Sequence, residues 1–409
     1  MKRLFVIALA VAMLLGLLCG CAANGGKMKQ GLEYINNPST YDEWLNNAKI
    51  ESLTSLGNTN RLKDVIERAK NGEELTIAYI GGSITEGDHL DTCYAARSYR
   101  YFCESFAKKG EEQITFVNAG ISGTPSNLGA LRFESEVLAY DPNIVFIEFA
   151  VNDGNDNETK DAFECLIRAC LDYETKPAVV LLFSRMEEGW TSQDWKKEIG
   201  AHYDVPMISY ADGITYMFDN NVIQWSDFSH DYAHPHAEGN ALVNEFISYF
   251  YDEVDRLPAQ GEAEPAMPER MYAGFYQNAH LIQRVNDYKP TEKGSWRNSS
   301  SGFHYDKGWT KTYDDTNDPL VIEFTGKNAY VLYPTSGNQT FGTLVANIYF
   351  NGELVATKEF DEYVDGGWMC PSVGKLYRSP TVGEYRIEFS VPAGQERTDV
   401  QVLAVGYTD

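Results

Sequence analysis

A serine flanked by glycines follows a short apolar stretch near residue 80. Residues Leu75–Ile80 lead directly into the sequence Gly-Gly-Ser-Ile-Thr-Glu-Gly, in which the serine is Ser83. A serine on a tight turn directly after a buried strand exposes its hydroxyl, and a nucleophile is useful at such a place. A glycine-rich turn can also bind phosphate, but the Gly-x-x-x-x-Gly-Lys-Ser/Thr pattern of nucleotide-binding loops is absent. The turn alone is weak evidence for a nucleophile.

A histidine near residue 234 has the surroundings of a catalytic base. Asp231 stands three residues before His234, and Pro235 follows directly. An acid at this spacing can orient the imidazole toward a serine across the edge of a sheet. His230 and His236 flank this histidine, but neither has both the acid and the proline. We therefore expect His234 to be the base and Asp231 to orient it.

Two further turns lie between the serine and the histidine in the sequence. The first, residues 118–124, reads Asn-Ala-Gly-Ile-Ser-Gly-Thr and contains Gly123. The second, residues 149–153, reads Phe-Ala-Val-Asn-Asp and contains Asn152. We expect Asp153, next to it, to form a turn or to cap a helix rather than to act as a catalytic acid. Each of the four segments is commonplace, but four in this order, each after a separate element, are not.

The elements that carry these residues alternate between strands and helices over residues 60–255. The strand candidates are short apolar runs rich in β-branched or aromatic residues, which is typical of strands buried on both faces. They are Leu75–Ile80, Ile114–Asn118, Ile144–Phe149, Val179–Phe183 and Met207–Tyr210. Amphipathic stretches lie between them, at Tyr94–Lys108, Leu128–Tyr140 and Asp161–Tyr173. This alternation predicts a three-layer α/β domain with a parallel sheet, whose ligands collect at the carboxyl ends of the strands.

These four segments resemble the SGNH (GDSL-like) hydrolase family, whose four sequence blocks supply Ser, Gly, Asn and His. The resemblance covers residues 70–250 and implies a flavodoxin-like α/β fold and a metal-free esterase without a cofactor. It implies that Ser83 is the nucleophile, that His234 is the general base, and that Asp231 orients His234. It also implies an oxyanion hole formed by the backbone N–H groups of Ser83 and Gly123 and by the side-chain amide of Asn152.

The sequence departs from the family pattern at two positions. The first block usually reads Gly-Asp-Ser, whereas Gly82 here replaces the acid, so another group must steady the turn. The third block usually has a glycine two residues before its Asn, whereas this chain has Ala150 there, which narrows the site. Neither position carries a reacting group. Arg97 and Arg132, on the helices after the first two blocks, are expected to be solvated or ion-paired.

The composition changes after the helix-like segment Ala237–Val254. Residues 256–271 are polar and contain three prolines, which indicates a linker. Strand candidates then follow without a convincing helix, and Asn351-Gly352 is a hairpin turn signal between two of them. This pattern predicts an all-β sandwich, jelly-roll-like, over residues 272–409. The strand candidates are Val321–Phe324, Ala329–Tyr333, Leu344–Phe350, Leu354–Phe360, Tyr385–Val391 and Val400–Val405.

The first residues have the pattern of a secretory signal. Two basic residues precede an apolar stretch from Leu4 to Leu18, which is too short to span a bilayer. Leu-Cys-Gly-Cys at residues 18–21 resembles the bacterial lipobox, which implies a lipidated Cys21 and attachment to the membrane at the bacterial surface or facing the periplasm. The expected divisions are a lipoprotein signal peptide (1–21), an N-terminal tether and lead-in (22–59), the hydrolase domain (60–255), a linker (256–271) and the β-sandwich (272–409).

The composition excludes several classes of protein. The chain has 409 residues, with 34 basic and 59 acidic side chains and a net charge of −25, and it contains no basic patch. Such a chain repels phosphate backbones, so nucleic acid is not expected as a partner. The five cysteines after Cys21 form no metal-binding pattern and are expected to be buried small hydrophobes. They are Cys93, Cys103, Cys165, Cys170 and Cys370.

Sequences that resemble this one, with Gly-Gly-Ser-Ile-Thr in the first block, are often secreted carbohydrate O-acylesterases, mainly deacetylases. The resemblance therefore implies that the substrate is an acylated carbohydrate. Two alternatives are a lysophospholipase or short-chain lipase, and a glycan-binding lipoprotein with an inactive hydrolase fold. Trp296, Trp309 and Trp368 are candidates for stacking on sugars, although tryptophans of a β-sandwich more often fill its core. The sequence does not determine the oligomeric state.

Overall fold

The computed structural model describes residues 31–87, 92–258, 266–284, 288–299, 304–312, 318–392, 394, 395, 397 and 399–409. The expected signal peptide and the lipidation site Cys21 lie outside these residues and stay predictions. Among the described helices, none has the length and apolar character needed to cross a membrane. Residues 32–409 form one compact unit.

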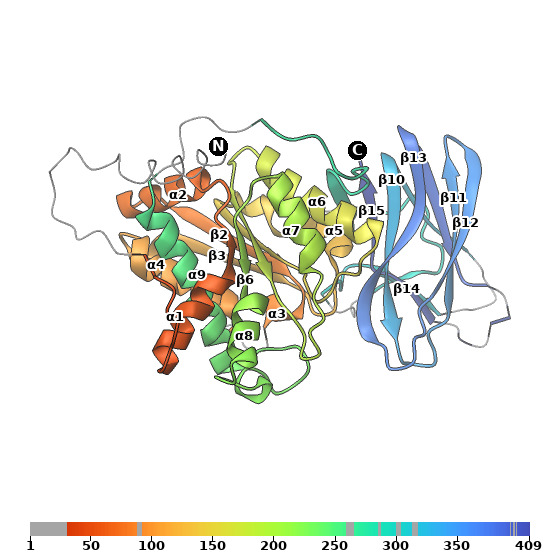
Figure 1. Ribbon diagram of the computed structural model, residues 1–409. Coiled ribbons are helices and arrows are strands. Elements are labelled where there is room, and N and C mark those ends of the chain that lie inside the picture. The colour runs from red at the N-terminus through yellow and green to blue at the C-terminus, as the bar shows by residue number, and fades with distance from the viewer. Residues whose placement is uncertain are drawn as a thin grey trace, which may run out of the picture. The chain divides into compact units, whose positions relative to one another are not determined.

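The first part of this unit is a six-stranded sheet between two layers of helices (Figure 1). Its strands are β1 (Leu53–Ser55), β2 (Leu75–Gly81), β3 (Ile114–Gly120), β4 (Ile144–Glu148), β5 (Ala178–Phe183) and β6 (Met207–Ser209). The α-helices are α1 (Tyr41–Ser52), α2 (Asn60–Asn71), α3 (Ser83–Glu86), α4 (Tyr94–Phe106), α5 (Ser126–Glu136), α6 (Asn157–Asp172), α7 (Gln193–His202), α8 (Tyr210–Asp219) and α9 (Ala237–Arg256). Short 3₁₀ turns are η1 (Gly110–Gln113), η2 (Leu138–Tyr140) and η3 (Trp225–Asp227).

The strand order β1-β6-β5-β4-β2-β3 fixes where a ligand can bind. Strands β2 to β6 are parallel, and the chain reverses its direction of travel across the sheet next to β2. In parallel α/β sheets the crevice at such a reversal point is where ligands bind. The register places Gly81, at the end of β2, opposite both Gly120 and Glu148. The three predicted turns that follow β2, β3 and β4 therefore meet at one edge of the sheet.

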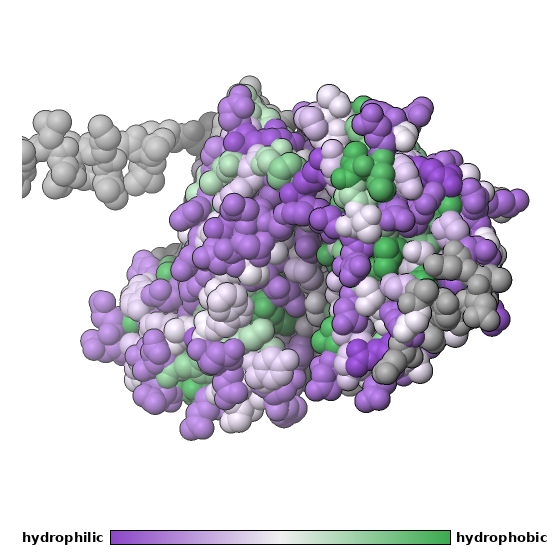
Figure 2. Space-filling view, turned by 90° about the vertical axis from the view of Figure 1, so that its right-hand side faces the viewer, coloured by the Kyte–Doolittle hydropathy of each residue, from purple (hydrophilic) through white to green (hydrophobic). Residues whose placement is uncertain are grey.

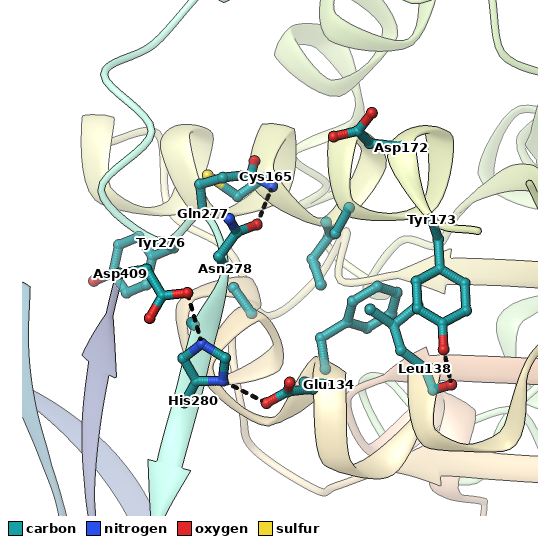
Figure 3. A pocket seen from close by; sticks show the side chains of 15 residues that line it. Glu134, Leu138, Cys165, Asp172, Tyr173, Tyr276, Gln277, Asn278, His280 and Asp409 are labelled. Atoms are coloured by element: carbon teal, nitrogen blue, oxygen red, sulfur yellow. Dashed lines mark hydrogen bonds and ion pairs between the residues drawn. The ribbon is translucent and has the colours of Figure 1, made fainter. Parts of the chain in front are cut away.

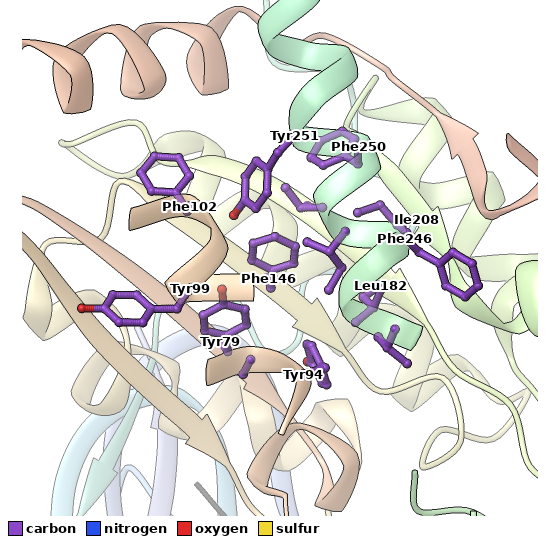
Figure 4. Packing of buried hydrophobic residues seen from close by; sticks show 14 of the residues in the cluster. Tyr79, Tyr94, Tyr99, Phe102, Phe146, Leu182, Ile208, Phe246, Phe250 and Tyr251 are labelled. Atoms are coloured by element: carbon purple, nitrogen blue, oxygen red, sulfur yellow. The ribbon is translucent and has the colours of Figure 1, made fainter. Parts of the chain in front are cut away.

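The strands are buried on both faces, as their apolar sequences predict. Tyr79 and Phe146 point to one face, where their rings stack at 4.9 Å and helix α9 adds Tyr251 (Figure 4). That face is covered by α2, α4, α8 and α9. Alternate residues such as Ile80 and Ile147 point to the other face, which α5, α6 and α7 cover. The three-layer α/β fold is confirmed, and each strand keeps within one or two residues of its predicted bounds.

The segment expected to serve as a lead-in, residues 22–59, contains a helix and a strand of this domain. Helix α1 begins with a capping box in which the Thr40 hydroxyl accepts from the Glu43 N–H and the Glu43 side chain reaches back. Strand β1 pairs antiparallel with β6, with Leu53 opposite Ile208. A three-residue strand is too short to show a hydrophobic period, so the sequence pattern did not reveal it.

The C-terminal region consists of two antiparallel sheets, which confirms the predicted β-sandwich. One has the order β12-β11-β13-β10-β15-β7 and the other β14-β9-β8. Trp296 and Trp309 lie in the core that residues of both sheets share. The strands are β7 (Ala279–Ile282), β8 (Arg297–Asn298), β9 (Trp309–Thr312), β10 (Leu320–Ser336), β11 (Thr343–Phe350), β12 (Glu353–Asp361), β13 (Trp368–Ser390), β14 (Asp399–Val402) and β15 (Ala404–Thr408).

The two regions share one hydrophobic core. The cluster beneath α5 and α6 continues into the sandwich through buried residues such as Tyr330 and Leu403. Two acids of α6 also hold the backbone that joins the regions: Asp161 accepts from the Gly274 N–H at 2.6 Å, and Glu164 from the Met271 N–H at 2.6 Å. The surface in Figure 2 is mostly hydrophilic, with hydrophobic residues in small separate areas. The shared cluster and these two hydrogen bonds pack the sandwich against α5 and α6.

Candidate active site

Ser83 is the first residue of α3, the four-residue helix that begins where β2 ends. The Gly82 carbonyl accepts from the Glu86 N–H at 3.0 Å, which closes the turn around the serine. The first N–H groups of a helix have no partner within the helix. Among the described residues, no group accepts a hydrogen bond from the Ser83 N–H. The turn thus presents a hydroxyl and a backbone donor side by side.

Three predicted residues form a continuous chain of hydrogen bonds. The His234 Nε2 atom lies 2.8 Å from the Ser83 Oγ atom, and the His234 Nδ1 atom lies 2.7 Å from the Asp231 Oδ2 atom. An ionised carboxylate can only accept, so Nδ1 carries the proton and Nε2 offers its lone pair to the serine hydroxyl. This is the arrangement in which a histidine can take the proton of an attacking serine.

Asp231 is held in its ionised form although part of it is buried. Burial acts to raise the pKa of this carboxyl. The effect is outweighed by the N–H groups of His234 and Ala233, which donate to Oδ1 at 2.7 and 2.8 Å, and by the imidazole, so the pKa falls to about 2. The carboxylate that orients His234 is therefore charged throughout the neutral range.

The loop that carries the histidine is fixed by its own polar residues. The Ser229 hydroxyl donates to the carbonyls of Asp231 at 2.9 Å and of His234 at 2.5 Å. His236 instead caps α9, where its Nδ1 atom accepts from the Gly239 N–H, and its ring packs against His230 with centroids 4.4 Å apart. The structure thus brings His234 to the serine and places the two flanking histidines in other contacts.

The predicted oxyanion donors lie around the same turn. A Cβ atom built on Gly82 would be 2.1 Å from the Asn152 Oδ1 atom, so the Asn152 amide rests directly on the residue before the serine. Asn152 donates no side-chain hydrogen bond to another described residue, and its buried Oδ1 atom has no partner. Gly123 has a left-handed backbone with φ +72°, and no described group accepts from its N–H.

Residues 79–242 match the model of the GDSL-like Lipase/Acylhydrolase family, and this stretch contains the serine, the histidine and the turns between them. This part of the chain is a GDSL-like acylhydrolase domain. The protein is accordingly a carboxylic ester hydrolase.

The two-domain architecture of this GDSL-like hydrolase is also found in solved structures. The fold is similar to that of a two-domain esterase, CEX, that is active on acetylated mannans, with a TM-score of 0.76 and 26% identity over 88% of this chain and 99% of that chain. A structure of CEX co-crystallized with mannopentaose gives a TM-score of 0.74 and 26% identity, and covers 88% and 98%. No curated protein matches the sequence.

The structure explains why the GDSL-like domain lacks the usual Asp in its first block. Gly82 has φ −88° and ψ −150°, so no left-handed backbone requires glycine there. The requirement is steric, because any Cβ there would displace the Asn152 amide. The turn is steadied instead by Thr85, whose hydroxyl bonds the Tyr94 hydroxyl at 2.8 Å and the buried Glu148 carboxylate at 3.2 Å.

A buried ion pair lies directly behind Asn152, and the sequence did not reveal it. The Lys196 ammonium is 2.7 Å from the Asp153 carboxylate, and both side chains are fully buried. Burial lowers the pKa of Lys196 to about 8, although Asp153 opposes the shift. Asp153 also accepts from the Ser126 N–H at 2.7 Å and so caps α5, as predicted for a helix cap. The pair fixes the turn that carries Asn152.

Arg132 was expected to be either solvated or ion-paired. The structure shows that it is ion-paired and buried. Its guanidinium is fully buried and lies 2.6 Å from Glu136. It also donates to the Gly81 carbonyl at 3.1 Å and to the Ala119 carbonyl at 2.6 Å, at the ends of β2 and β3. One side chain therefore joins the two strand ends from which the first two blocks begin.

We expect Arg132→Met to lower the free energy of unfolding by about 3 kcal/mol, because it removes the buried charged donor to the Gly81 and Ala119 carbonyls and leaves Glu136 without its partner. Urea unfolding at neutral pH measures the change. Arg386→Met is the matched control, since Arg386 pairs with Glu292 and Glu323 at the surface. Its loss should cost less than about 1 kcal/mol. Equal losses for the two variants would contradict the role given to Arg132.

Two residues of the C-terminal sandwich lie beside Gly123. A Cβ atom built on Gly123 would be 2.7 Å from the Trp368 ring and 3.0 Å from the Cys370 Sγ atom. Trp368 is 49% exposed, whereas Trp296 and Trp309 are buried in the sandwich core. Of the three tryptophans, Trp368 therefore stays a candidate for stacking on sugars. The expectation that all five cysteines are buried is wrong for Cys370, which is partly exposed next to this turn.

Proposed function

We propose that this protein is a serine esterase that removes acetyl groups from a polysaccharide of the mannan type. The observation that carries the proposal is the hydrogen-bonded chain from Ser83 through His234 to Asp231, at 2.8 and 2.7 Å, beside backbone and amide donors. A nucleophile, a base and its orienting acid beside N–H donors form the arrangement that acyl transfer needs.

In the first half of the proposed reaction, Ser83 Oγ attacks the carbonyl carbon of the acetyl ester. His234 Nε2 takes the hydroxyl proton, and the negative charge that develops on the carbonyl oxygen is met by the N–H groups of Ser83 and Gly123 and by the Asn152 amide. Each such donor is worth about 2.7–4 kcal/mol in the transition state. His234 then gives the proton to the departing sugar oxygen, which leaves an acetylated Ser83.

In the second half, a water molecule attacks the acetyl carbonyl and gives its proton to His234. The tetrahedral intermediate uses the same donors, and its collapse returns the proton from His234 to Ser83 Oγ and releases acetic acid, which ionises to acetate in solution. Asp231 stays ionised throughout, since its pKa is about 2, and stabilises the imidazolium that forms twice in the cycle. No step requires a metal ion or a cofactor.

Two observations support a carbohydrate as the alcohol part of the ester. Both regions of the chain are similar to CEX, which is active on acetylated mannans. Trp368 adds a half-exposed indole beside Gly123, and indole faces pack well against the apolar faces of sugars. Ala150 is fully buried two residues before Asn152, and we propose that its methyl group, where the family usually has glycine, favours a short acyl group.

We expect the wild-type protein to release acetate from acetylated mannan. Acetylated xylan is assayed in parallel as a comparison substrate. We further expect kcat/KM for 4-nitrophenyl esters to fall by at least about tenfold from acetate to octanoate, because a longer acyl chain must displace packed side chains. A preference for octanoate would indicate a lipase or lysophospholipase instead. A protein that binds the polysaccharide and hydrolyses none of these esters would be a binding protein with an inactive hydrolase fold.

A further inference from the structure

Glu86 connects the turn of the serine to the turn of Gly123. It is the last residue of α3, three residues after Ser83. Its Oε2 atom accepts from the Ser122 N–H at 2.7 Å and from the Ser122 hydroxyl. A carboxylate that accepts two bonds from one residue fixes the orientation of that residue. The position of Gly123 relative to Ser83 therefore depends on this side chain.

The other oxygen of Glu86 is bound by the C-terminal sandwich region. The His304 Nε2 atom lies 2.9 Å from the Glu86 Oε1 atom, and because a carboxylate only accepts, the imidazole N–H donates. Glu86 is 25% exposed and His304 38% exposed. The imidazole thus holds the carboxylate in the rotamer that reaches Ser122.

The same region also contacts the peptide between Ser122 and Gly123. The Cys370 thiol is 3.9 Å from the Ser122 carbonyl oxygen and 3.7 Å from the Gly123 carbonyl oxygen. In a planar trans peptide the C=O and the following N–H point in opposite directions. With the Ser122 carbonyl turned toward Cys370, the Gly123 N–H points away from the sandwich. Glu86 therefore holds Ser122 at its N–H and hydroxyl, and Cys370 contacts the same residue at its carbonyl.

We propose that Glu86, held by His304 of the C-terminal region, is a positioning residue that aims the Gly123 N–H at the developing oxyanion. Glu86 does not touch the substrate, and it acts through the Ser122–Gly123 turn. The C-terminal region thereby contributes to ester hydrolysis itself, in addition to any contact with the glycan. The inference rests on the proposed reaction at Ser83.

The chain offers a matched control for this pair. Glu134 on α5 and His280 on β7 form a second glutamate–histidine contact between the same two regions, at 2.6 Å. Figure 3 shows His280 between Glu134 and Asp409, at the edge of a cavity of about 240 Å³ whose lining includes neither Ser83 nor His234. Substitutions there test the effect of losing an interdomain contact without changing the Gly123 turn.

We expect Glu86→Met to lower kcat for 4-nitrophenyl acetate by about 10- to 100-fold, with KM within about twofold, since a donor displaced by less than 1 Å loses much of its effect. The inhibition constant of phenylboronic acid, which forms a tetrahedral adduct with an active serine, should rise by a similar factor. Glu86→Gln keeps one acceptor for the Ser122 N–H, so its kcat should be at least about fivefold higher than that of Glu86→Met. Glu134→Met should stay within twofold of wild type in both measurements.

His304→Asn tests the contribution of the C-terminal region. His304 has a left-handed backbone with φ +61°, which Asn tolerates, and the shorter side chain cannot reach Glu86. We expect kcat to fall about three- to tenfold, and to fall no further when the substitution is added to Glu86→Met, because the two residues act as one unit.

The possible failures can be told apart. A wild-type protein that hydrolyses none of the esters overturns the proposed function. If wild type is active, the inference is overturned when Glu86→Met keeps kcat within twofold, when its boronate inhibition is unchanged, or when Glu134→Met shows the same loss. Absence of any recovery in Glu86→Gln also overturns it, because the hydrogen bond to Ser122 would then not be the cause.

Discussion

Ser83→Ala is expected to lower kcat for ester hydrolysis by about 10⁴- to 10⁶-fold. The substitution removes the atom that attacks the ester and leaves His234 without the hydroxyl that it contacts at 2.8 Å. Because the side chain sits on a four-residue helix whose backbone bonds do not involve Oγ, the fold should be unaffected. Initial rates with 4-nitrophenyl acetate and acetate release from acetylated mannan measure the loss, and thermal unfolding checks the fold.

Ser135→Ala is the matched control for this loss. The Ser135 hydroxyl bonds the Arg132 carbonyl at 3.2 Å on α5 and contacts no residue of the proposed site. Its removal should leave kcat within about twofold, as for a single weak side-chain hydrogen bond. A Ser83→Ala protein that keeps more than a tenth of the wild-type kcat would refute the assignment of the nucleophile.

Gly82→Asp restores the Gly-Asp-Ser sequence that is usual in the family, and we expect it to lower kcat by about 10²- to 10³-fold, as the loss of one oxyanion donor does. A Cβ atom at this position would be 2.1 Å from the Asn152 Oδ1 atom and 2.7 Å from its Cγ atom, both too short for a Cβ contact, so one of the groups must shift. We expect the Asn152 side chain to move, because the Gly82 backbone is held by its hydrogen bond with the Glu86 N–H. Steady-state kinetics with 4-nitrophenyl acetate measure the effect.

A double-mutant cycle separates this cause from a general distortion of the turn. Asn152→Ala removes the amide that the new side chain would strike, and it should lower kcat by about 10²-fold or more. Because both changes act on one donor, the Gly82→Asp/Asn152→Ala protein should be no worse than Asn152→Ala. Additive losses, or a Gly82→Asp protein with wild-type kcat, would contradict the role of Asn152.

The contacts of Ser83 and His234 were predictable because the sequence signals of both residues are local. Ser83 directly follows a strand whose apolar sequence marks it as buried, and the Asp231–His234 spacing lies within one loop. The register of parallel strands then brings distant turns to one edge, so recognising the strands was sufficient to expect the turns of Ser83, Gly123 and Asn152 together. The resemblance supplied what the pattern could not, namely the roles of Gly123 and Asn152.

The residues that support the site were not predictable from these patterns. Lys196 and Arg132 look like surface charges on amphipathic helices, and only the packed structure shows that each is fully buried with a partner. The first half of β13, which carries Trp368 and Cys370, has glycine, proline and polar residues that obscure a period of two. Polar partners far apart in sequence leave no periodic trace, which is why Glu86 and His304 were missed.

The continuous core between the helices and the sandwich has an evolutionary consequence. Accessory modules of modular enzymes are often gained, lost or exchanged, because a linker lets each fold alone. Here the module buries residues such as Tyr330 and Leu403 in the same cluster as α5 and α6. A replacement from another lineage would have to reproduce that interface and the contacts to Gly123 at once. The two halves of this chain are therefore constrained to diverge together, and their recombination with unrelated partners is disfavoured.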